Sequence, residues 1–300
     1  MTSERLFSLT LLIAAGAGYG SIFIANKVVI SSGLNFIVYI FWMSFFSSFI
    51  ALILFLFDIN KIKLNLNSIL HFNSSAFFGM ILPFGIIAAL ADSLPAGILT
   101  LTFTLAPAFT YTFSFILKIS SFNTLNLLGL VFGLIGVLLI ILPDTSLPNS
   151  KDYILVLIAL LAPLGASINN IIVAKLRPTK MPTSFLVLSI LLSATVIMLL
   201  VSISTSNFDF FWNFGKDAIV GVLWASFVQV LGYYALYEVI RKTGPIFFSQ
   251  IAYIVVGTGI LWAYIFLDEK LSSWIWIAIV FLVLGLFLSN LGLKKENKKS

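Results

Sequence analysis

The sequence predicts an all-α membrane protein with ten transmembrane helices, arranged as two inverted five-helix repeats with both termini in the cytoplasm. Three observations carry this prediction: the composition, the distribution of basic residues and an internal duplication. Of the 300 residues, 60% are hydrophobic and 9% are charged, against roughly 45–50% and about 25% in a soluble domain. So large an apolar surplus exceeds what one core can bury, which excludes a water-soluble globule.

The lengths of the apolar stretches favour helices over the strands of a β-barrel. A hydrocarbon core of about 30 Å requires about 20 apolar residues per helix, whereas barrel strands would be about half as long and would alternate apolar with polar residues. The first stretch is too long for a cleaved signal peptide. The predicted spans are 6–29, 35–57, 72–91, 94–117, 124–142, 153–174, 183–203, 218–240, 245–267 and 272–292.

Basic residues predict the orientation, because loops rich in Lys and Arg stay in the cytoplasm. Alternate connections between these spans carry thirteen basic residues on one side and three on the other, which places both termini inside. The net charge of +6 comes from short loops and a short tail, so the expected partner is a bilayer with anionic headgroups and no nucleic acid. The predicted location is the cytoplasmic (inner) membrane of a bacterium.

The two halves of the chain are related by an offset of 149 residues, which brings Gly136 of the fifth span onto Gly285 of the tenth. Each half contains five spans with a Pro-led fourth helix. Because five is odd, the halves must have opposite orientations in the membrane, as in many transporters. The predicted units are an N-terminal repeat over 1–148, a C-terminal repeat over 149–292 and a basic cytoplasmic tail over 293–300.

Three motifs carry a resemblance to a known family. They are Tyr19, Gly20 and Ser21 followed by Lys27; Pro95, Ala96 and Gly97 followed by Pro107; and Thr243, Gly244, Pro245, Gln250, Tyr253, Gly257, Asp268, Glu269, Lys270, Leu271 and Trp276 through Gly285. In this order the sequence resembles the ten-helix EamA type of the drug/metabolite transporter superfamily. Phe41 and Trp42 stand where that family usually has an Arg. The resemblance implies a secondary carrier, often an exporter, of amino acids, related metabolites or toxic organic compounds.

Polar side chains within the predicted spans are the candidates for substrate binding, because such groups are costly in lipid and usually face a cavity. Gln229 and Tyr233 share one face of the eighth span, and Gln250 and Tyr253 share one face of the ninth. Pro163 precedes the adjacent amides of the sixth span. The ten candidates are Ser21, Lys27, Thr104, Tyr111, Asn169, Asn170, Gln229, Tyr233, Gln250 and Tyr253.

Each candidate also has a structural interpretation. The polar groups could bond neighbouring helices, and tyrosines near span ends could lie in the headgroup belt. Lys27 could extend to the headgroups, because it lies near the end of the first span. The GxxxG spacing of Gly129 and Gly133 predicts a close helix contact, within a monomer or in a homodimer.

The sequence contains few of the side chains that enzymes use for nucleophilic or metal-assisted catalysis. There is no Cys, and His71 is the single His, so thiol nucleophiles and most metal sites are excluded. Ser21 follows Gly-Tyr-Gly but is expected to lie on the opposite side of the membrane from His71. We therefore expect no catalytic residues, no metal and no cofactor; an intramembrane enzyme is the non-transport alternative.

The predicted function is secondary transport of small organic metabolites by alternating access, by export or exchange. One alternative is an uptake carrier for a cofactor-like metabolite such as S-adenosylmethionine, whose cationic sulfonium would depend on Asp92 or Glu238. Another is multidrug efflux, which the lack of a mid-membrane Asp or Glu makes less favoured. The substrate, the direction, the coupling ion and the oligomeric state do not follow from the sequence.

Overall fold

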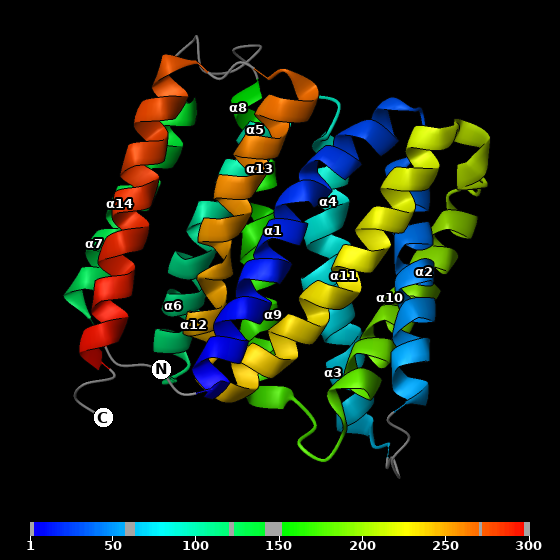
Figure 1. The fold of residues 1–300 in the computed structure, drawn as a ribbon, viewed down its shortest axis with the longest axis horizontal. Coiled ribbons are helices and arrows are strands. Elements are labelled where there is room, and N and C mark those ends of the chain that lie inside the picture. The colour runs from blue at the N-terminus through cyan, green and yellow to red at the C-terminus, as the bar shows by residue number, and fades with distance from the viewer. Residues whose placement is uncertain (1–2, 58–63, 120–122, 142–151, 270–271, 297–300) are drawn as a thin grey trace.

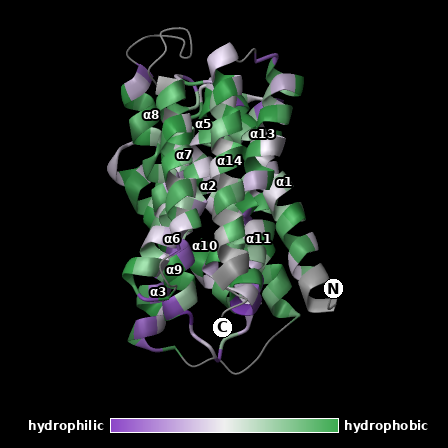
Figure 2. Cartoon of the chain, turned by 90° about the vertical axis from the view of Figure 1, so that its left-hand side faces the viewer, coloured by the Kyte–Doolittle hydropathy of each residue, from purple (hydrophilic) through white to green (hydrophobic). Residues whose placement is uncertain are grey.

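The computed structural model describes residues 3–57, 64–119, 123–141, 152–269 and 272–296. All regular secondary structure in these ranges is helical. The helices lie side by side along roughly one direction (Figure 1). Hydrophobic residues cover the middle of the bundle, and hydrophilic residues gather toward its ends (Figure 2). The predicted junction of the two halves at 148–149 and the end of the basic tail at 297–300 lie outside the described residues.

The first half of the chain comprises α1 (Ser3–Ser31), α2 (Phe36–Leu56), α3 (Leu66–Ala76), the π-helical turn η1 (Phe77–Ile81), α4 (Leu82–Leu90), α5 (Ala96–Thr102), the 3₁₀ turn η2 (Phe103–Leu105), α6 (Ala106–Ile116) and α7 (Thr124–Ile141). The second half comprises α8 (Tyr153–Ala159), α9 (Leu161–Leu176), α10 (Thr183–Ser204), the 3₁₀ turn η4 (Phe211–Phe214), α11 (Lys216–Thr243), α12 (Pro245–Ser249), α13 (Ile251–Leu267) and α14 (Ser273–Glu296).

Eight helical segments of the described chain are long and apolar enough to cross a membrane. They are Phe7–Ser31, Phe36–Leu56, Leu66–Leu90, Ala96–Ile116, Tyr153–Leu176, Thr183–Ser204, Lys216–Thr243 and Pro245–Leu267. Within α7 and α14, the apolar segments Leu127–Gly136 and Ser273–Gly285 are shorter. The structure thus supports an all-helical membrane protein, and the count of ten spans stays a prediction.

The third segment begins six residues before the predicted start at residue 72. Asn65 caps it, because its side-chain oxygen accepts the N–H of Ser68 at 2.8 Å and the Ser68 hydroxyl at 2.7 Å. Such a cap satisfies backbone donors at the start of a helix. Counting apolar residues missed this first polar turn, and the extension places His71 inside the helix rather than at its edge.

Three of the segments are interrupted where a proline lacks the N–H that would bond the carbonyl four residues earlier. Pro107 has no N–H to bond the carbonyl of Phe103. In the 3₁₀ turn η2, the N–H of Ala106 bonds that carbonyl instead. Pro83 follows the π-helical turn η1. Pro163 follows the break between α8 and α9 at Leu160. These breaks loosen the regular helix in the middle of the bundle.

The two halves of the chain pack extensively against each other. Helix α7 packs on α14, α2 packs on α10, and α1 packs on both α11 and α13. The α7–α14 pair forms one edge of the bundle and the α2–α10 pair lies toward the other (Figure 1). The elements between these two edges therefore come from both halves.

The α7–α14 contact confirms the predicted role of the GxxxG glycines. A Cβ built on Gly285 would lie 2.6 Å from the carbonyl oxygen of Gly129 and 2.9 Å from the amide nitrogen of Gly133. Backbone atoms cannot rotate away as a side chain can, so the two helices approach this closely only because position 285 has no side chain.

Glu269 joins the two halves at the end of the bundle opposite to the start of α1. The carboxylate of Glu269 accepts the N–H groups of Ala96 at 2.7 Å and of Gly97 at 2.9 Å. These are the first two residues of α5, whose N–H groups have no partner within the helix. The negative charge also suits the positive end of the helix dipole.

We expect Gly285→Val to destabilise the protein by on the order of 1–3 kcal/mol, because overpacking displaces backbone atoms of α7. The matched control is Gly257→Val, since nothing lies within 4 Å of a Cβ at Gly257. The midpoint of thermal unfolding in detergent, followed by tryptophan fluorescence, measures the difference. Equal midpoints for the two variants would show that α7 and α14 do not depend on this contact.

Candidate functional site

A cavity lies in the middle of the bundle, between the two halves of the chain. The cavity has a volume of about 90 Å³, which is room for several water molecules. The elements around it are α1, η1, α4, η2, α6, α9, α11, α12 and α13. The lining residues are Tyr19, Ile22, Phe23, Asn26, Gly79, Pro83, Phe84, Ile87, Phe103, Ala106, Ala166, Asn169, Asn170, Tyr233, Leu236, Phe248, Ser249, Ile251, Ala252 and Val255.

Three of the interrupted segments place their breaks at this cavity, while the break at Leu160 lies outside the lining. Gly79 belongs to the π-helical turn, Phe103 belongs to the 3₁₀ turn, and Ser249 and Ile251 flank the junction of α12 and α13 at Gln250. Irregular backbone at membrane depth is tolerated where it is buried in protein or lines a cavity. The prolines of the sequence therefore help to position this site.

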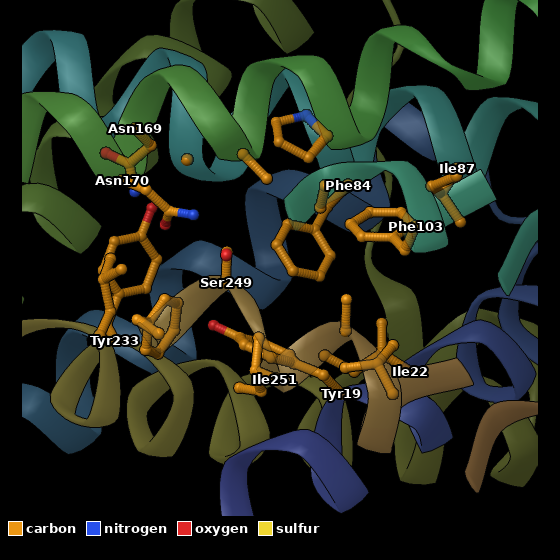
Figure 3. A pocket seen from close by; sticks show the side chains of 18 of the residues that line it. Tyr19, Ile22, Phe84, Ile87, Phe103, Asn169, Asn170, Tyr233, Ser249 and Ile251 are labelled. Carbon is orange, nitrogen blue, oxygen red and sulfur yellow. The ribbon is translucent and has the colours of Figure 1, made fainter. Parts of the chain in front are cut away.

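Polar side chains gather at one part of the cavity, where Asn169, Asn170 and Tyr233 lie close together (Figure 3). The amide nitrogen of Asn170 donates to Thr110 Oγ1 at 3.2 Å, and the hydroxyl of Tyr233 donates to the carbonyl of Ser75 at 3.2 Å. Asn169 is 3% exposed, and its Oδ1 has no hydrogen-bond partner within the described chain. A buried acceptor left in this state costs about 1–3 kcal/mol, so a ligand that donates to it would be favoured.

Asn26 adds a second unsatisfied amide from α1. Its Oδ1 accepts the hydroxyl of Tyr39 at 2.8 Å, whereas its Nδ2 has no partner among the described residues. Sequence reasoning missed Asn26 and selected the neighbouring Lys27. The spacing from Tyr19 to Asn26 is i, i+7, which places both on one helix face, and this signal could have identified the residue.

Aromatic and aliphatic side chains form the rest of the wall. Phe84 and Phe103 lie together, away from the amides (Figure 3). The ring of Phe103 meets that of Phe23 edge to face, with centroids 5.5 Å apart, and Phe84 lies 5.8 Å from the ring of Tyr19. None of the described lining residues carries a charge at neutral pH, and no group of three metal-ligating side chains occurs among the described residues.

Three of the ten predicted site residues, Asn169, Asn170 and Tyr233, line this cavity. The other seven lie outside its lining. From the first half, Ser21 accepts the indole N–H of Trp224 at 2.7 Å, Lys27 donates to the backbone carbonyl of Asp92 at 3.3 Å, Thr104 donates to the carbonyl of Leu101 at 2.7 Å, and the Tyr111 hydroxyl accepts the N–H of Asn123 at 2.7 Å.

The remaining three come from the second half. Gln229 is fully buried in α11, and neither atom of its amide has a partner in the described part of the chain. Gln250 forms the junction between α12 and α13, and Tyr253 follows in the first turn of α13. Helical spacing predicted a shared face for each pair, but only Tyr233 turns toward the cavity.

Comparison with known protein families gives a match over both halves of the chain. A profile of the EamA-like transporter family matches residues 6–142 and again residues 153–291. The chain belongs to the EamA-like transporter family. This result confirms the resemblance to the EamA type of the drug/metabolite transporter superfamily, and it assigns the chain to the membrane transporters.

A solved structure shares the fold of this EamA-like chain. The match, titled "Crystal structure of protein", has a TM-score of 0.70 and 14% sequence identity, and it covers 96% of this chain and 98% of the other. In all, 26 chains of solved structures match. No curated protein matches the sequence.

We expect Gly79→Ala to lower the rate of solute exchange by about tenfold, since crowding of this kind costs about 1–3 kcal/mol. A Cβ at Gly79 would lie 2.4 Å from Asn169 Nδ2 and 2.6 Å from the Tyr233 hydroxyl. Gly85→Ala is the control, because a Cβ there meets nothing within 4 Å. Exchange of labelled solute by purified protein in liposomes measures both. If Gly79→Ala exchanged as fast as Gly85→Ala, Asn169 and Tyr233 would not belong to the pathway.

Proposed function

We propose that this EamA-like protein is a secondary carrier that exports or exchanges small organic metabolites, amino acids or related compounds, across the inner membrane of a bacterium by alternating access. The ten spans, the two repeats over 1–148 and 149–292 and the cytoplasmic termini are part of this proposal. The observation that carries it is the central cavity, which both halves line and in which Asn26 and Asn169 each leave one buried amide atom without a partner among the described residues. Inverted repeats with a site between them are the usual basis of alternating access.

The chemistry of the cavity favours a neutral or zwitterionic solute with an apolar part. Within the described chain, Asn169 Oδ1 is an acceptor and Asn26 Nδ2 a donor without a hydrogen-bond partner. Phe84, Phe103 and Ile87 supply an apolar surface beyond them. A solute with both a donor and an acceptor at one end would satisfy the amides and place its apolar part against the rings.

The carboxylates that a cationic solute would require lie elsewhere. Asp92 is exposed at the end of the first half's third segment and accepts the hydroxyl of Ser31 at 2.8 Å. Glu238 accepts hydrogen bonds from Thr183 and Arg241. Neither lines the cavity, so a sulfonium such as S-adenosylmethionine is less well supported than a solute without net positive charge.

The distribution of charge supports cytoplasmic termini. We call the end of the bundle where α1 begins and α14 ends the basic end (Figure 1). Loops and helix ends there carry Lys118, Lys175, Arg177, Lys180 and Arg241. The opposite end carries Asp92, Asp209, Asp217, Asp268 and Glu269. By the positive-inside rule, the basic end faces the cytoplasm.

Counterflow in proteoliposomes tests the function. Liposomes loaded with pooled amino acids, polyamines and nucleoside-type metabolites are exposed to one labelled solute at a time, with and without a pH gradient. We expect accumulation of a neutral or zwitterionic class. If folded protein moved no organic solute in either direction, transport of such metabolites would be refuted; accumulation of cations alone would refute the assignment of substrate class.

We expect Asn169→Ala to slow counterflow of that solute by about tenfold, because loss of one or two hydrogen bonds to the solute costs on the order of 1.4 kcal/mol. Asn73→Ala is the matched control, since Asn73 is exposed on α3 and donates only to the carbonyl of Ile69. Elution as a single species on size exclusion shows that each variant is folded. Equal rates for the two variants would remove Asn169 from the site.

A further inference from the structure

A second cluster of polar side chains lies between the cavity and the basic end, around the only His of the sequence. His71, on α3, is fully buried. Its Nε2 lies 2.6 Å from the hydroxyl of Tyr237 on α11, and the two rings meet edge to face with centroids 6.0 Å apart. This contact joins the first half of the chain to the second.

A second contact between the same helices lies one turn closer to the cavity. Ser75 follows His71 by one turn on α3, and Tyr233 precedes Tyr237 by one turn on α11. The hydroxyl of Tyr233 donates to the backbone carbonyl of Ser75 at 3.2 Å. We call these two contacts, His71–Tyr237 and Ser75–Tyr233, the polar ladder. Because Tyr233 also lines the cavity, the polar ladder connects the cavity with the basic end.

The charges around His71 come from two elements. On α11, Glu238 accepts from Thr183 and Arg241. After α9, Arg177 lies 5.4 Å from the centre of the Tyr237 ring and donates to the Tyr237 carbonyl at 3.0 Å. Lys175 on α9 is turned to the carbonyl of Leu117, and α10 carries no ionisable side chain.

Protonation of His71 is disfavoured in this arrangement. Nδ1 has no hydrogen-bond partner among the described residues, so an imidazolium would bury a charged donor without an acceptor. Arg177 adds a positive charge at the Tyr237 ring, and the carboxylate of Glu238 is already engaged. Water at the basic end would solvate the imidazolium only if α3 and α11 separated there.

We propose that His71 is a proton-binding site that couples protonation to opening of the basic end. A proton from water at that end would bind Nδ1, while the other ring nitrogen would donate to the Tyr237 oxygen. Since the closed arrangement disfavours the imidazolium, protonation shifts the population toward an open one by the same differential affinity. The proposal rests on the proposed alternating-access function, but it is tested without a solute.

Because the sequence contains no Cys and one His, both probes are free of background. The first is nuclear magnetic resonance of ring-labelled histidine in the unaltered protein, purified with a tag that contains no histidine. The second is labelling of Ser249→Cys, which lines the cavity, by a membrane-impermeant maleimide in lipid nanodiscs. Ser93→Cys, at an exposed position of the opposite end, is the control for thiol reactivity.

The labelling rate of Ser249→Cys is divided by the rate in the Ser249→Cys, His71→Gln double variant at the same pH, which cancels the pH dependence of the thiol. We expect a ratio near one at pH 8 and about threefold or more at pH 6, because only the imidazole gains a proton there. The corresponding ratio for Ser93→Cys should stay near one. The single histidine signal should change over the same pH range.

A constant histidine signal from pH 8 to pH 5 would overturn the proposal, as would a ratio for Ser249→Cys that does not vary with pH. Should His71→Gln fail to fold, Tyr237→Phe keeps the imidazole and removes its partner; it should retain the pH response with a shifted midpoint, and an unshifted midpoint would refute the polar ladder. Failure of solute counterflow with these results intact would refute the proposed transport of organic metabolites and leave the proton-binding role of His71 standing.

Discussion

Lipid offers no hydrogen bonds to a backbone, so a chain in a bilayer must satisfy its own peptide groups. The unbroken helices α2, α7, α10 and α14 do so, and none of their described residues lines the cavity, whereas the unbroken α1 and α11 contribute side chains to it. The interrupted segments around Gly79, Phe103 and Gln250 enclose the cavity together with α1 and α11. At the 3₁₀ turn η2, the N–H of Ala106 bonds the carbonyl of Phe103, and beside the π-helical turn η1 the Tyr233 hydroxyl bonds the carbonyl of Ser75. The same constraint thus determines both the outer bundle and the place of the site.

Most of the helical organisation follows from the sequence, because length and hydropathy act locally. The segment boundaries agree closely except at Leu66, where an Asn cap starts a helix with polar residues. The GxxxG contact was predictable from Gly129 and Gly133, since small residues permit close approach whatever the partner. That the partner is α14, at Gly285, required the three-dimensional arrangement, because spacing defines a face and leaves its neighbour unknown.

The site was predictable only where a local cost identified it. Adjacent amides at Asn169 and Asn170 are expensive in hydrocarbon unless they face a cavity or partners, and both line the cavity. The charge of Lys27 made it a candidate, but it is the neighbouring Asn26 that lines the cavity. The sequence places His71 at a span end, where hydropathy gives no reason to expect a buried contact. Its contact with Tyr237, 166 positions away, cannot be inferred from periodicity.

In the contact between Glu269 and α5, the acceptor is a side chain, whereas the two donors, the N–H groups of Ala96 and Gly97, belong to the backbone. A substitution at Ala96 or Gly97 by any residue other than proline keeps the N–H donors, because they belong to the backbone. Glu269 and its partners in α5 are therefore not expected to vary together among related sequences, although they are in contact across the two halves. Methods that infer contacts from correlated substitutions would overlook this hydrogen-bonded contact between the halves. Only substitutions at Glu269 itself would reveal it.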